Sequence, residues 1–85
     1  MKSYTFHTDP GHGWLEVDKA ELVEFNIADK ISQCSYQRGN KAFLEEDCDA
    51  MLFVEAFKAK YGASPLFLDN YRERTPITSY ARYQA

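Results

Sequence analysis

Two strand–turn–strand patterns, each followed by the start of a capped helix, constrain the fold of this chain most strongly. In the first pattern, residues 2–7 alternate between apolar and polar side chains, and residues 14–17 read as a return strand. Pro10 and Gly11 lie between them and predict a type II turn with a positive φ at Gly11. The expected register pairs Phe6 with Leu15, Tyr4 with Val17 and His7 with Trp14, and the first two pairs form the buried face.

A short helix is expected at residues 18–26. Asp18 and Glu21 have the spacing of a capping box, which satisfies two free backbone donors of the first helical turn. Asn26 suits the left-handed conformation that ends a helix, with Ile27 packing behind it.

The second hairpin pattern covers residues 33–45. Gly39 and Asn40 suit a two-residue turn, and the resulting register pairs Tyr36 with Phe43. The main helix follows at residues 48–61, with Asp47 expected as its N-cap and Gly62 as its stop. Its apolar residues at helical spacing predict one buried stripe, made of Ala50, Phe53, Val54, Phe57 and Tyr61.

The last quarter of the chain is less regular. Residues 66–68 predict a strand, and residues 70–85, interrupted by Pro76, form either an edge strand or an extended arm. A chain of 85 residues makes a single domain over residues 1–85. The predicted class is α+β: a small antiparallel sheet from two hairpins plus a C-terminal strand, packed against the main helix 48–61 and the short helix 18–26.

The charge and the cysteines narrow the function classes. A formal net charge of -3 is too small to mark a nucleic-acid binder or an acidic mimic of DNA. The first residues do not read as a signal peptide, and no apolar run approaches the ~20 residues that span a bilayer. We therefore expect a cytoplasmic protein, in which Cys34 and Cys48 are reduced and partly buried thiols.

The loop of residues 7–14 contains both histidines of the protein, with one carboxylate between them. His7, Asp9 and His12 supply three ligands of the kind that Zn²⁺ or Fe²⁺ takes, although their spacing matches no established motif. A second interpretation is a plain hairpin turn that Asp9 caps. A third is a recognition loop, with His12 exposed and Trp14 on the strand face away from the core.

The C-terminal segment interleaves tyrosine with arginine. The residues concerned are Tyr71, Arg72, Arg74, Tyr80 and Arg82. This mixture stacks on bases and contacts phosphate, and it is equally the composition of hot spots in protein interfaces. Because the chain is acidic overall, protein contact is favoured over nucleic acid.

Catalytic motifs are not found in the sequence. It contains no G-x-S-x-G, no P-loop and no G-x-G-x-x-G, and nothing in it places His7 or His12 beside Cys34 as the base of a nucleophilic pair. We expect a protein without enzymatic activity and without a cofactor.

Four segments together resemble a group of small uncharacterised proteins of bacteriophages, prophages and other mobile elements of Proteobacteria. They are residues 7–17, 31–39, 44–50 and 71–77. The resemblance implies an accessory protein made in the bacterial cytoplasm, with no assigned catalytic residues. By analogy, we expect it to bind a host or phage protein. The alternatives are nucleic-acid binding by the C-terminal segment, metal binding by the loop of residues 7–14, and self-association into a homodimer.

Overall fold

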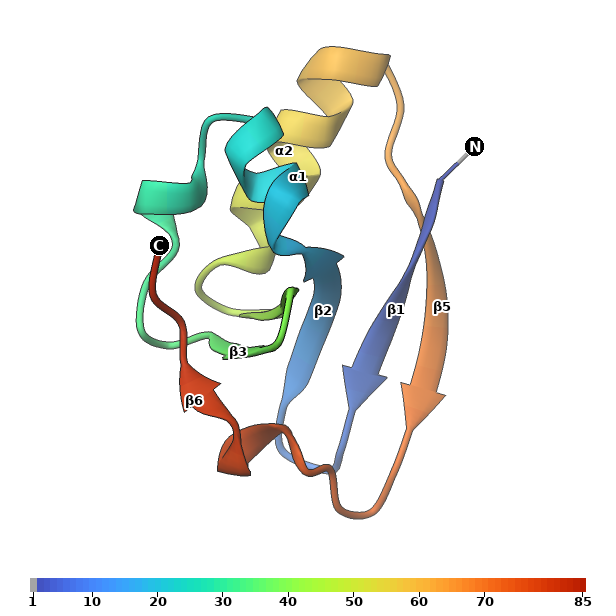
Figure 1. Ribbon diagram of the computed structural model, residues 1–85. Coiled ribbons are helices and arrows are strands. Elements are labelled where there is room, and N and C mark those ends of the chain that lie inside the picture. Colours follow the sequence, from blue (N-terminus) through green and yellow to red (C-terminus); the bar gives the residue numbers. More distant parts are fainter. Residues whose placement is uncertain (1) are drawn as a thin grey trace.

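Six strands form one mixed sheet in the order β5-β1-β2-β4-β3-β6 in the computed structural model, which describes residues 2–85 (Figure 1). The predicted α+β class is confirmed. The strands are β1 (Ser3–Thr8), β2 (Gly13–Asp18), β3 (Tyr36–Arg38), β4 (Lys41–Glu45), β5 (Leu66–Tyr71) and β6 (Ala81–Arg82). The helices are α1 (Lys19–Glu24) and α2 (Ala50–Tyr61), with short 3₁₀ turns η1 (Ala28–Lys30) and η2 (Ile77–Ser79).

Both hairpins have the predicted registers. Phe6 lies opposite Leu15, His7 opposite Trp14, and Tyr36 opposite Phe43. The type II turn is wrong, because the glycines with positive φ within residues 2–85 are Gly39 and Gly62. The first turn is instead closed by the Asp9 carboxylate, whose Oδ1 accepts hydrogen bonds from the backbone N–H groups of Gly11 and His12 at 2.9 and 2.8 Å.

Helix α1 begins and ends as its sequence predicts. The backbone N–H of Asp18 donates to Glu21 Oε1 at 3.0 Å, which is one half of the capping box. Asn26 takes a φ of 62°, and the N–H of Ile27 donates back to the carbonyl of Leu22 at 2.9 Å. These bonds satisfy carbonyls that the last turn of the helix leaves free.

Helix α2 ends at the predicted Gly62, with a φ of 78°, but begins later than expected. Its N-cap is Asp49, because the chain makes further turns after β4 and the N–H of Asp47 donates to Glu45 Oε2 at 2.6 Å. Phe53 and Phe57 are buried as predicted, while Tyr61 is exposed.

Strand β5 runs parallel to β1, so the sheet is mixed and not wholly antiparallel as expected. The reason is the path of α2, which returns the chain to the end of the sheet where β1 begins. The N–H of Leu66 therefore donates to the carbonyl of Lys2 at 3.1 Å, and β5 follows β1 in the same direction.

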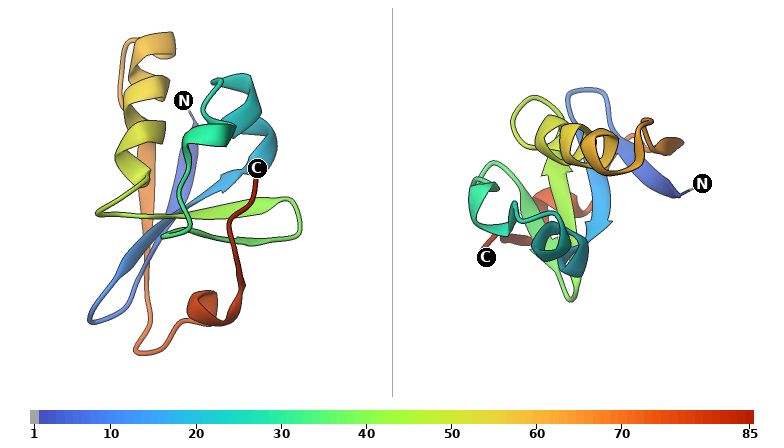
Figure 2. Two further views of the ribbon diagram at one scale, coloured as in Figure 1. Left: turned by 90° about the vertical axis from the view of Figure 1, so that its left-hand side faces the viewer. Right: turned by 90° about the horizontal axis from the view of Figure 1, so that it is seen from above.

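The two helices cover one face of the sheet, as Figure 2 shows from two further directions. The main core lies between them and the alternate strand residues that face them, Tyr4, Leu15, Val17, Ala42 and Leu44. A second, smaller core lies on the opposite face and contains Trp14, Phe43 and Ile77.

The second core is covered by residues 72–85, which we call the C-terminal strap. This segment runs from the end of β5 at one edge of the sheet, past the β1–β2 turn, to β6 at the other edge (Figure 1). It is fastened at its end by Tyr83, whose N–H donates to the Ser35 carbonyl at 2.9 Å and whose hydroxyl donates to the Ala28 carbonyl at 2.6 Å. Residues 70–85 are therefore neither one edge strand nor a free arm.

Candidate functional site

The predicted metal ligands are not gathered into one site. His7 Nε2 lies 2.7 Å from Glu16 Oε1, on the sheet face away from the helices. The Asp9 carboxylate is used to close its turn, and the His12 ring stacks on Trp14 with centroids 5.5 Å apart. Within residues 2–85, no group of three or more histidine, cysteine, aspartate or glutamate side chains is placed to hold a metal ion.

Trp14 is not an exposed contact residue, which corrects the sequence interpretation. It does lie on the strand face away from the helices, but only 1% of its surface is accessible. Phe43 and Ile77 cover it, and Ile77 belongs to the C-terminal strap. The loop of residues 7–14 therefore offers His12 alone as a large exposed side chain.

Two of the five tyrosines and arginines predicted as contact residues in the C-terminal segment, Tyr80 and Arg82, make packing contacts within the molecule. Tyr80 packs on Phe43, with ring centroids 5.2 Å apart. The guanidinium of Arg82 lies 4.6 Å from the centre of the Tyr36 ring, and it donates to the Gln33 carbonyl at 3.0 Å. The exposed members of the predicted set are Tyr71, which belongs to β5, and Arg72, Arg74 and Arg82. The segment therefore keeps one tyrosine and three arginines at the surface.

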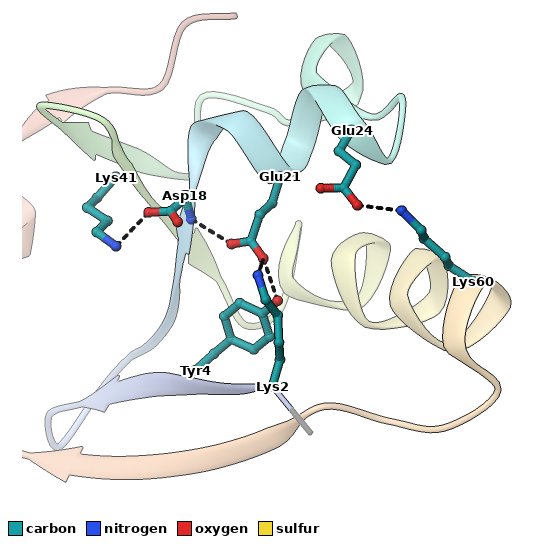
Figure 3. A network of polar contacts seen from close by, with 7 residues as sticks. All are labelled: Lys2, Tyr4, Asp18, Glu21, Glu24, Lys41 and Lys60. Carbon is teal, nitrogen blue, oxygen red and sulfur yellow. Dashed lines mark hydrogen bonds and ion pairs between the residues drawn. The ribbon is translucent and has the colours of Figure 1, made fainter.

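A polar network under α1 accounts for several charged side chains (Figure 3). Glu21 is buried and accepts hydrogen bonds from the Tyr4 hydroxyl at 2.5 Å and from Lys2 Nζ at 3.0 Å. Burial, and then the hydrogen bond to Glu21, raise the pKa of Tyr4. At either side, Lys41 pairs with Asp18 and Lys60 with Glu24. Each acid of the network is matched by a lysine, so the network stabilises the fold.

Cys34 and Cys48 are exposed, so the expectation of partly buried thiols is wrong. Both lie in turns, which the buried Asp49 carboxylate holds together by accepting hydrogen bonds from the hydroxyls of Ser32 and Ser35 at 2.8 and 2.5 Å. The neighbouring Cys34 thiol, by hydrogen bonding, raises the pKa of Cys48 to about 11. Cys48 is thus the reverse of an activated nucleophile, which needs a lowered pKa.

Among the elements of residues 2–85, β5 has the most exposed large apolar side chains. Four of its side chains are large and apolar, and each leaves between 46% and 58% of its surface exposed: Leu66, Phe67, Leu68 and Tyr71. The strand lies at the edge of the sheet, with β1 as its neighbour on one side and no strand from residues 2–85 on the other (Figure 1). An edge that is both apolar and unpaired is a surface to which another strand can add.

The main chain of β5 alternates between its two sides. The N–H of Leu66 donates to the carbonyl of Lys2, next to β1, at 3.1 Å, and the N–H of Arg72 donates to the carbonyl of Thr8 in β1 at 2.9 Å. Residues two apart in a strand face the same way, so the N–H and C=O groups of Phe67, Asp69 and Tyr71 point outward. These outward groups are the hydrogen-bonding positions of the free edge.

An apolar pocket of about 280 Å³ lies beside this edge, between α2 and the sheet. Phe6 and Leu15 form its floor, and the exposed Met51 and Phe67 stand at its walls. Two carboxylates, Glu46 and Asp69, also line it. A Cβ atom on Gly13 would come within 3.0 Å of the Glu46 side chain and 2.9 Å of the Phe6 ring, so a larger residue there would displace these two pocket-lining side chains.

Comparison of the chain with protein-family models, with curated proteins and with solved structures finds no match. In residues 2–85, neither helix has the length and apolar character that a membrane crossing requires. The class is therefore defined by the fold and this site: a small α+β protein with one open, apolar edge of its sheet.

Proposed function

We propose that this is a non-catalytic accessory protein, of bacteriophage or mobile-element origin, which binds a host or phage protein in the bacterial cytoplasm. The observation that carries the proposal is the free edge of β5, with four exposed apolar side chains and outward-facing backbone groups. Natural proteins protect such edges with lysine, proline, a bulge or a short strand. Within Leu66–Tyr71 there is no lysine and no proline, and the pairing with β1 is continuous.

The opposite edge of the same sheet supports this interpretation by contrast. Strand β6 consists of Ala81 and Arg82 alone, so it is short and charged, as protected edges are. The β6 edge is thus protected against pairing with another strand, whereas the β5 edge is available for it. A binding role explains the difference, because exposed apolar patches in soluble proteins commonly mark interaction sites.

A binding role also suits the remaining polar groups. His7 is the histidine closest to a carboxylate, and it is paired with Glu16. Within residues 2–85 its hydrogen-bond partners are Glu16 and Asn70, and neither is a serine or cysteine that it could activate. The side chains that sequence analysis singled out are largely engaged in holding the fold. Strand β5 contributes four of the exposed large apolar side chains of residues 2–85, more than α2 contributes with three and α1 with one.

The experiment is affinity capture from a nuclease-treated lysate of a bacterial host, with tagged wild type, Leu68→Lys and Val23→Lys. Leu68 and Val23 are exposed at 57% and 68%, so either lysine is tolerated by the fold, but Val23 lies on α1 and away from β5. We expect wild type and Val23→Lys to retain the same protein, and Leu68→Lys to lose it. Equal capture by all three, or capture of nothing by wild type, contradicts the proposal.

A further inference from the structure

We infer that the partner of β5 is an extended segment that adds as an antiparallel strand, places one large apolar side chain in the pocket beside α2, and carries a lysine or arginine two residues away on the same face. This inference rests on the proposed binding function and names the chemistry of the partner. Three features of the edge lead to it, namely its backbone, its pocket and its charge.

The backbone requires a strand. Phe67, Asp69 and Tyr71 direct their N–H and C=O groups outward, and a β-strand satisfies such alternating groups along its whole length. The antiparallel direction is the slightly more stable one per residue and the commoner one. In that arrangement, the partner residues opposite Phe67 and Asp69 turn their own backbone groups toward β5 and their side chains toward the helix face.

The pocket selects one apolar side chain on that face. Its volume of about 280 Å³ lies below the ~300 Å³ at which small-molecule sites begin, and it suits a single leucine, methionine or phenylalanine. Its walls include Phe67 and Asp69 of the edge itself, so a side chain from an added strand enters beside them. On the opposite face, Leu66 and Leu68 are exposed and favour apolar residues in between.

The charge selects a basic segment and disfavours a second copy of this chain. Glu46 and Asp69 are exposed carboxylates at the pocket, within a chain of net charge -3. In a two-fold antiparallel pair of β5 strands, the registers that pair most of each strand bring the two Asp69 side chains opposite or diagonal to each other, about 5–8 Å apart. Like charges at that separation are destabilising, whereas lysines next to the apolar anchor complement both acids.

The test uses a blocked seven-residue peptide, Thr-Lys-Val-Phe-Val-Lys-Thr, titrated into the isotope-labelled full chain while backbone amide shifts are followed. We expect shifts centred on β5, and at least tenfold weaker binding when both lysines are replaced by glutamate. N-methylation of the phenylalanine amide, which faces β5, weakens binding at least tenfold. N-methylation of a valine amide, which faces solvent, is the matched control and changes it less than threefold.

Charge reversal on the protein completes the test. Glu46→Lys together with Asp69→Lys should reverse the preference from the basic to the acidic peptide, which also shows that the variant is folded. Glu55→Lys, on the exposed side of α2, should leave the preference unchanged. Equal binding of both peptides, indifference to the site of N-methylation, or a wild-type dimer that occupies β5 overturns the inference. If β5-dependent capture from lysate persists while the basic peptide fails to bind, only the inference falls and the proposed function stands.

Discussion

Glu21 joins three parts of the chain through one buried carboxylate. One oxygen accepts the Asp18 N–H of the capping box, and the other accepts the Tyr4 hydroxyl and Lys2 Nζ (Figure 3). In Glu21→Gln, an amide NH₂ group replaces one of the two carboxylate oxygens. This group cannot accept a hydrogen bond from the donors that surround it. We expect a loss of about 1–3 kcal/mol in the free energy of unfolding, measured by urea denaturation.

The matched control is Glu24→Gln, whose side chain is half exposed and pairs with Lys60. It should change stability by no more than about 0.5 kcal/mol. Tyr4→Phe combined with Glu21→Gln should cost less than the sum of the two single changes, because the unpaired hydroxyl is then removed. Equal effects of Glu21→Gln and Glu24→Gln would contradict this account.

The thiol pair allows a test of local pH dependence. With its pKa raised to about 11 by the hydrogen bond with Cys34, Cys48 remains protonated at pH 8. The thiolate fraction of Cys48 at pH 8 is then about a hundredfold smaller than that of an ordinary thiol. A thiolate of higher pKa is a stronger nucleophile, which offsets about tenfold of this loss in rate. We expect alkylation of Cys48 by iodoacetamide to be about tenfold slower than normal, and to rise with pH until about 11. Mass spectrometry of the peptide that contains Cys48 measures the alkylation rate. Cys34→Ala should raise this rate to that of an ordinary thiol. An unchanged rate in Cys34→Ala would contradict the hydrogen bond between Cys34 and Cys48.

At the scale of elements, the C-terminal strap is held by one apolar side chain in particular. Ile77 is 2% exposed and covers Trp14, the single tryptophan of the chain. Ile77→Ala should lower the free energy of unfolding by about 2–4 kcal/mol, as large-to-small changes in a core do. It should also shift the native fluorescence of Trp14 to the red, because water then reaches the indole.

Thr78→Ala is the control for the strap, since Thr78 is exposed and next in the chain. Its stability and emission should stay at wild-type values. A native emission that does not respond to Ile77→Ala would mean that the second core does not depend on the strap.

Local patterns predicted the elements well, because their causes lie within a few residues. The alternation around Phe6 and Leu15, the capping box at Asp18 and the stop at Gly62 are all confirmed. Asp47 is wrong as the N-cap because the turns after β4 delay the start of the helix to Asp49. The Asp49 carboxylate does not cap the helix but accepts hydrogen bonds from Ser32 and Ser35, which no local pattern indicates.

The candidate site was harder to predict, because it depends on pairings across the whole molecule. Alternation places Trp14 on the second face, but no local rule shows that Ile77 returns to cover it. Three consecutive apolar residues in β5 usually indicate a strand buried on both faces. Here they lie at an edge, because α2 returns the chain to the outer side of β1. The sequence offered the apolar composition of residues 66–68 as a signal, but the edge position that turns it into a candidate site comes only from the pairing of β5 with β1.

At the scale of the whole molecule, both outer strands of the sheet come from the last part of the chain. During synthesis on a ribosome, β1 emerges first, and one of its two sides stays unpaired until β5 has left the exit tunnel. One side of β3 likewise stays unpaired until β6 emerges, and Trp14 stays uncovered until Ile77 emerges. Such long-range pairings form late and slowly. A nascent chain that stalls after α2 therefore presents two open strands and a bare tryptophan to its neighbours, where the finished protein presents one open edge.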